Sequence, residues 1–186
     1  MKPIYVVLTK TGTILSRLIS KITGDWYTHA SVSFDDNLQT MYSFGRRWTH
    51  NPLIGGFMKE STEYGIMRKF ADSDTVVIQV ELDDAKYHEI VDYVTAMYAE
   101  RKKYKYNYLG LFFSRWKVAV RSRKANRFYC SEFVNDILER FGIIKRGQFG
   151  KVVRPMELLK LQLEGIGKVI YRGALSKFKP AKIYLQ

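Results

Sequence analysis

The order of apolar patterns along the chain constrains its fold most strongly. Runs typical of strands occupy 4–8, 29–34, 39–44, 66–70, 75–82, 168–171 and 181–185. Apolar residues at helical spacing occupy 14–22, 83–101, 107–116, 128–141 and 154–163. A turn at Asp35, Asp36 and Asn37 joins two of the strands into a hairpin, whereas Gly55 and Gly56 indicate an irregular connection. Strands that dominate early and late, with helices between them, predict an α+β fold.

The length and composition predict one domain over residues 1–186. The chain has 186 residues, 46% of them hydrophobic, and it shows no repeat, low-complexity segment or linker. No stretch approaches the roughly 20 apolar residues of a membrane span. The first apolar run is too short for the core of a signal peptide, so we expect a cytoplasmic protein.

Cys130 is the single cysteine of the sequence. It therefore excludes an internal disulfide and a zinc site built from several cysteines. His29, His50 and His88 have no metal-ligand spacing among themselves. We expect no metal and no cofactor.

Cys130 is expected in the first turn of the helix over 128–141. A thiol there lies near the positive end of the helix dipole and near backbone N–H groups without helical partners. Both favour the reactive thiolate, and the same N–H groups can stabilise an oxyanion. The alternative is a buried, inert cysteine on an amphipathic helix, whose apolar stripe is Phe133, Val134, Ile137, Leu138 and Phe141.

His29 stands at the start of a predicted strand. A base on a rigid strand against a nucleophile at a helix end suits nucleophilic catalysis, and such a base needs a third group to fix its ring. The facing strand offers Ser43 for that purpose. Taken singly, His29 is better explained as an ordinary strand-end histidine.

These residues together resemble a known family. A strand that begins with His29, a polar residue on the next strand, and the helix Tyr129-Cys130-Ser131-Glu132 are similar to the circularly permuted papain-like hydrolases of the NlpC superfamily. This branch includes the YiiX-like proteins and, more distantly, the lecithin:retinol acyltransferase-like enzymes. In it, as here, the histidine precedes the cysteine. The resemblance implies a permuted papain-like fold, an antiparallel sheet packed against helices.

The resemblance also implies roles for three residues. Cys130 becomes the nucleophile of a cysteine hydrolase, His29 its general base and Ser43 the third member. Relatives usually carry a Glu, His or other plainly polar residue at that third position; a serine orients the imidazole but stabilises its charged form little. Asp35 and Asp36, in the predicted turn, are poor substitutes. The reaction implied is acyl transfer through a thioester, on peptide, cell-wall or lipid-derived acyl groups, and both amide and ester chemistry stay open.

The charge distribution points to an anionic partner. The net charge is +13; residues 72–100 hold eight acids against one base, and residues 101–127 hold ten bases and no acid. Aromatic residues interleave with those bases, so the segment 101–127 fits a solvated face over core rings, a surface for anionic lipid, or single-stranded nucleic acid. The sequence has no RNA- or DNA-binding motif, which disfavours the last.

The sequence therefore fits three functions. The first is a metal-independent cysteine hydrolase of the amidase or peptidase type. The second is a non-catalytic relative that binds an anionic partner through residues 101–127. The third is a lipid acyltransferase or thioesterase at a membrane surface. The bases before Cys130, among them Arg121, Arg123 and Lys124, are expected to form a positive surface beside it.

Overall fold

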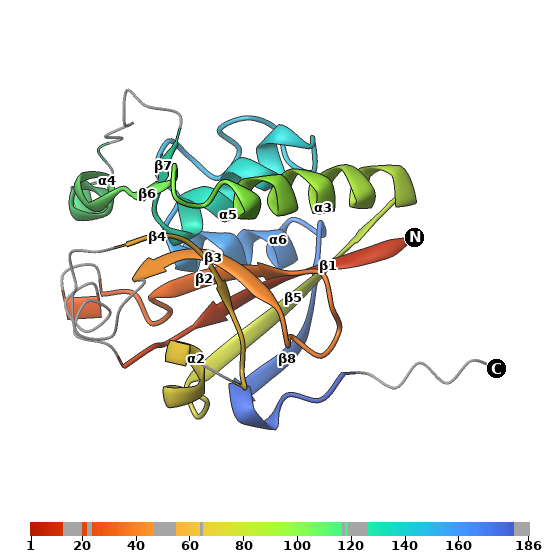
Figure 1. The fold of residues 1–186 in the computed structure, drawn as a ribbon, viewed down its shortest axis with the longest axis horizontal. Helices are drawn as coiled ribbons and strands as arrows, with labels where there is room; N and C mark the ends of the chain where they lie inside the picture. Colours follow the sequence, from red (N-terminus) through yellow and green to blue (C-terminus); the bar gives the residue numbers. More distant parts are fainter. Residues whose placement is uncertain are drawn as a thin grey trace.

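A computed structural model of the chain describes residues 1–12, 20–21, 24–46, 55–63, 65–116, 118 and 126–180. Within them it forms a mixed α+β structure built on one eight-stranded sheet (Figure 1). The strand order is β7-β6-β4-β3-β2-β1-β5-β8, and every neighbouring pair is antiparallel except β6 and β7. The strands are β1 (Lys2–Thr9), β2 (His29–Ser33), β3 (Met41–Arg46), β4 (Gly55–Glu60), β5 (Asp74–Leu82), β6 (Lys105–Tyr106), β7 (Arg127–Phe128) and β8 (Lys168–Ala174).

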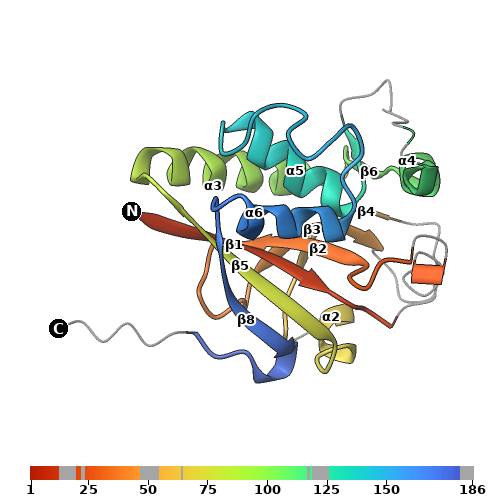
Figure 2. The ribbon, with the colours of Figure 1, turned by 180° about the vertical axis from the view of Figure 1, so that it is seen from behind.

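Helices cover both faces of the sheet. Figure 1 shows α3, α5 and α6 on one face and the short α2 on the other, and Figure 2 shows the same layers from behind. The helices are α2 (Gly65–Lys69), α3 (Asp84–Ala99), α4 (Tyr108–Phe113), α5 (Cys130–Arg140) and α6 (Lys160–Leu163), with 3-10 turns η1 (Ser114–Trp116), η2 (Pro155–Leu159) and η3 (Leu175–Lys177).

The alternation of side chains along the strands explains the two layers. On β1, Val6 and Leu8 join the larger core cluster beneath α3, α5 and α6, while Tyr5 and Val7 join a smaller cluster on the opposite face. The larger cluster includes Phe44, Phe57 and Phe133, whose rings lie 5.0–5.4 Å apart between centroids. Because Phe133 is on α5, Phe44 on β3 and Phe57 on β4, this aromatic contact packs the helix against the two strands.

The structure confirms the α+β class and the hairpin between β2 and β3. In its turn, the Asp35 carboxylate accepts hydrogen bonds from the N–H groups of Gln39 and Thr40 at 2.9 Å. The predicted helices over 83–101, 107–116, 128–141 and 154–163 are also present, with shorter bounds and 3-10 turns in two of them. The expected helix over 14–22 lies largely outside the described residues, and the expected strand over 181–185 lies wholly outside them.

Two local predictions are wrong. Residues 66–70 were expected as a strand but belong mainly to α2, where Met67 is buried while Arg68 and Lys69 are exposed, as on one turn of a helix. The predicted irregular connection at Gly55 and Gly56 is instead the start of β4. A Cβ on Gly55 would stand 2.7 Å from Tyr108 Oη and 2.8 Å from Tyr106 Cβ, so this glycine marks a close approach inside a strand.

Candidate active site

Cys130 is the first residue of α5. Tyr129 precedes the helix in an extended conformation (φ −100°, ψ 171°), and the buried face of α5 anchors it through Phe133, Val134, Ile137 and Leu138. The thiol is enclosed, because Cys130 is only 2% exposed. Its position places it beside the N–H groups of the first helical turn, which have no acceptor within the helix.

His29 is the first residue of β2, opposite Thr9 on β1. Its imidazole lies close enough to the Cys130 side chain for the two groups to interact, so residues about a hundred positions apart in the sequence meet at the start of a strand and the start of a helix. The His29 side chain keeps 12% of its surface exposed. The contact is therefore largely removed from water.

Glu60, the last residue of β4, holds the other side of the ring. Its Oε2 atom lies 3.0 Å from His29 Nε2, and the Glu60 side chain is only 6% exposed. Because Nε2 faces Glu60, Nδ1 is the ring nitrogen left for the thiol. Cys130, His29 and Glu60 thus form a chain of thiol, imidazole and carboxylate.

The carboxylate determines the protonation of the imidazole. Burial alone would lower the pKa of His29, but the charge of Glu60, together with hydrogen bonds to Cys130 and Glu60, raises this pKa well above the usual value of about 6.5. The imidazolium is consequently favoured at neutral pH. Such a cation beside a sulfur atom stabilises a thiolate.

Ser43 does not have the contact predicted for it. It lies on β3, and Met41, two residues before it, belongs to the smaller core cluster, as the alternation of side chains predicts. Its buried Oγ atom makes no hydrogen bond with any residue that the structure describes. In this arrangement the partner that orients His29 is Glu60.

The register of the sheet explains how a residue two strands away replaces Ser43. In the strand order, β3 separates β4 from β2, so Glu60 must reach across β3. It does so where Gly45 has no side chain: a Cβ on Gly45 would lie 3.6 Å from Glu60 Oε1 and 3.7 Å from Ser43 Oγ. A longer side chain at this position would compete with the carboxylate.

A second network fixes the start of the nucleophile helix. Glu132 Oε2 accepts hydrogen bonds from the Tyr129 N–H and from Asn107 Nδ2, both at 3.2 Å. Asn107 is buried, and its Oδ1 atom accepts the Gly110 N–H at 2.9 Å, which caps α4. Ser131 Oγ donates to the Val153 carbonyl at 2.8 Å. Two neighbouring segments therefore hold the first turn of α5, one through the Asn107 side chain and the other through the Val153 carbonyl.

Two buried tyrosines lie near the thiol. Burial and, next, the charge of Cys130 raise the pKa of Tyr106 well above its usual value. Burial and the charge of Glu132 likewise raise the pKa of Tyr129. Both phenols are therefore protonated at neutral pH and place neutral rings near the site.

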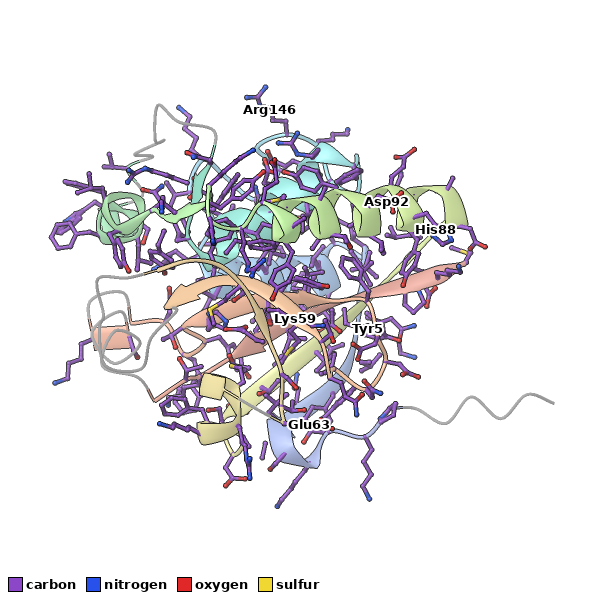
Figure 3. The ribbon with its side chains drawn as sticks, in the orientation of Figure 1. Tyr5, Lys59, Glu63, His88, Asp92 and Arg146 are labelled. Atoms are coloured by element: carbon purple, nitrogen blue, oxygen red, sulfur yellow. The ribbon has the colours of Figure 1, made fainter. Side chains whose placement is uncertain are left out.

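The remaining sequence candidates lie elsewhere. His88 is exposed on α3, 2.9 Å from Lys2 Nζ (Figure 3), and His50 is outside the described residues. So are Arg121, Arg123 and Lys124, and the positive surface expected there stays a prediction. Across the described part of the chain, no three His, Cys, Asp or Glu side chains are grouped as metal ligands. No helix in that part is both long and apolar enough to cross a membrane.

No family model matches the chain, and no curated protein is significantly similar to it.

Proposed function

We propose that the chain is a cysteine hydrolase that cleaves an amide or ester bond through a thioester on Cys130. The observation that carries the proposal is the contact of Cys130 with an imidazole whose other nitrogen lies 3.0 Å from the buried carboxylate of Glu60. An inert core cysteine has no need of such a partner. A thiol, a base and a group that orients the base are the components of nucleophilic catalysis by cysteine.

The chemistry follows from the positions of the protons. The Cys130 thiolate attacks the acyl carbonyl, and the His29 imidazolium gives its proton to the leaving amine or alcohol as the tetrahedral intermediate collapses. His29, now neutral, takes a proton from water, which attacks the thioester and releases the acid and the thiolate. Glu60 keeps the ring oriented and stabilises its charged form, which a serine would do only weakly.

The start of α5 supplies the second element of the mechanism. Backbone N–H groups in the first helical turn point toward the region of Cys130 and are suited to stabilise negative charge on the attacked oxygen. The hydrogen bonds of Glu132 and Ser131 hold this turn in place. Preorganised donors of this kind stabilise a transition state without rearranging during the reaction.

The order of the elements supports a circularly permuted papain-like arrangement. The histidine strand comes before the cysteine helix, and the helix packs on a mainly antiparallel sheet. Glu60 supplies a plainly polar third group of the kind usual in the resembling family, but it comes from β4 and not from β3, the strand next to the histidine strand. The acyl group that the protein accepts, whether from peptide, cell wall or lipid, is a matter for substrate screening.

A lipid acyltransferase or thioesterase acting at a membrane is the second candidate. Its support is a group of exposed aromatic side chains on α4 and η1, close in sequence to β6 and its basic neighbours. A non-catalytic binding protein is the rival to both, and it predicts a Cys130 that forms no acyl adduct.

A chromogenic activated ester tests the proposal. Mixed with p-nitrophenyl acetate, the protein should release a burst of p-nitrophenol and gain one acetyl group on Cys130, detected by intact mass and then lost by hydrolysis. Cys130→Ser should give no burst and no adduct. A folded wild-type protein that shows neither burst nor adduct would contradict the hydrolase and favour the binding protein.

A further inference from the structure

Large apolar side chains are exposed together at one end of the molecule. Of the eight that the described residues expose, five fall between residues 109 and 118, so they are concentrated rather than scattered. These five, called here the aromatic surface, are Leu109 (65% exposed), Phe112 (53%), Phe113 (37%), Trp116 (55%) and Val118 (49%).

The three rings of the aromatic surface also lie against one another. The Phe112 ring lies 5.4 Å from Phe113 and 5.5 Å from Trp116, measured between ring centroids, and Phe113 lies 6.3 Å from Trp116. These rings on α4 and η1 thereby form one contiguous apolar group. Figure 1 shows α4 on the opposite side of the molecule from the N-terminus.

Exposed bases adjoin this group. Lys105 and Arg127 are paired partners on β6 and β7, both are exposed, and β6 leads directly into the cap of α4. The sequence from 101 to 127 contains ten bases and no acid. Trp and Phe beside Lys and Arg, with no acid between them, match the chemistry of a negatively charged bilayer surface.

We propose that the aromatic surface, with Lys105 and Arg127, docks the protein on an anionic lipid bilayer. The rings enter the boundary between headgroups and acyl chains, and the bases pair with lipid phosphates. This inference does not depend on the chemistry proposed for Cys130. The surface nevertheless connects to that site, since Asn107 caps α4 and donates to Glu132 in the first turn of α5.

Vesicle sedimentation tests the docking surface. Wild-type protein is mixed with vesicles of phosphatidylcholine alone, or of phosphatidylcholine with phosphatidylglycerol, at low and at high NaCl. We expect the protein to pellet with the anionic vesicles, to pellet far less with the neutral ones, and to be released by salt. Failure to pellet with anionic vesicles, or equal pelleting with both kinds, overturns the proposal.

Two variants and two matched controls locate the contact. Leu109→Ser with Phe112→Ser should weaken vesicle binding at least about ten-fold, because two exposed apolar side chains no longer enter the bilayer. Lys105→Gln with Arg127→Gln should weaken it by a similar factor. Leu163→Ser, at an even more exposed leucine on α6 (81%), and Lys168→Gln on β8 should bind as wild type.

The other possible outcomes also test the docking proposal. If the variant at Leu109 and Phe112 binds vesicles as wild type does, or if the controls lose binding equally, the aromatic surface is not the contact. Analytical ultracentrifugation examines a second occupant: a wild-type dimer that this variant dissolves would make the surface an interface between copies and overturn the proposal. Unchanged thermal unfolding verifies that the variants are folded.

Discussion

At the scale of single residues, His29 is the group on which the account depends. It is nearly enclosed, it contacts Cys130, and Glu60 faces its Nε2 atom. The sequence indicated His29 and Cys130 through their positions at a strand start and a helix start. It did not indicate Glu60, because one glutamate four residues after a Gly-Gly pair resembles any exposed acid until the register of β4 is known.

The raised pKa of His29 predicts how stability depends on pH. In the unfolded chain the pKa of a histidine is about 6.5, and below this pH the protonated His29 stabilises the fold fully. The stabilisation is lost as the pH rises through the raised pKa of His29 in the folded protein. The free energy of unfolding should therefore fall as the pH increases above 6.5. Urea denaturation at a series of pH values measures it.

Two matched variants test whether His29 causes this decrease of the unfolding free energy with pH. His29→Gln should abolish the decrease, whereas His88→Gln, which removes an exposed histidine on α3, should keep it. A decrease of the same size in the His29 variant would show that other groups cause it, and that Glu60 does not hold His29 in its charged form.

At the scale of elements, short apolar segments were the least predictable. The long alternating or helical patterns of β5, α3 and α5 were recognised because their burial repeats over many residues. The segment of α2 carries too few apolar residues to distinguish a helix from a strand. The segment of β4 begins with two glycines that sequence patterns assign to loops, although Gly55 is needed where Tyr106 and Tyr108 approach.

The cap of α4 should affect the active site as well as stability. Asn107→Ala removes the hydrogen bond to Gly110 and a donor to Glu132, so we expect a loss of roughly 1–2 kcal/mol in unfolding free energy. It should also slow the reaction of Cys130 several-fold, because Glu132 holds the Tyr129 N–H beside the thiol.

Asp83→Ala is the matched control for Asn107→Ala. Asp83 caps α3 by accepting the Lys86 N–H at 2.8 Å, and it has no contact with α5 in the described structure. The control should lose stability by about 1 kcal/mol and leave the alkylation rate of Cys130 unchanged. Equal rates in both variants would mean that Asn107 contributes to folding alone.

At the scale of the whole molecule, the charge pattern of the sequence changes at the end of α3. α3 begins with acids near the N-terminus, where the Met1 amino group lies 3.3 Å from Asp84, and it ends toward the basic segment that leads to α4 (Figure 1). The sequence thus changes from acid-rich to base-rich where α3 ends. A charge distribution of this kind favours anions in general, and an anionic partner of this protein stays a prediction.

Hydrolysis of anionic substrates should therefore depend on salt. Turnover of a negatively charged activated ester should fall as NaCl increases toward physiological ionic strength, where screening acts over about 8 Å, while turnover of a neutral ester should not. Replacing Arg121, Arg123 and Lys124 together with Gln should reduce the difference between the two esters. If both esters respond to salt alike, or if the triple variant behaves as wild type, these bases have no part in recognition.

The central claim is that His29 and Glu60 activate Cys130, and alkylation as a function of pH tests it most directly. The rate of iodoacetamide labelling is measured by intact mass from about pH 6 to pH 9 for wild type, His29→Gln, Glu60→Gln and Ser43→Ala. We predict fast labelling already near pH 6.5 in wild type and in Ser43→Ala, a loss of at least about ten-fold in Glu60→Gln, and a still slower reaction in His29→Gln. A wild-type thiol that reacts only as free cysteine does, with a midpoint near pH 8.5, or a Glu60→Gln variant as fast as wild type, would contradict the account.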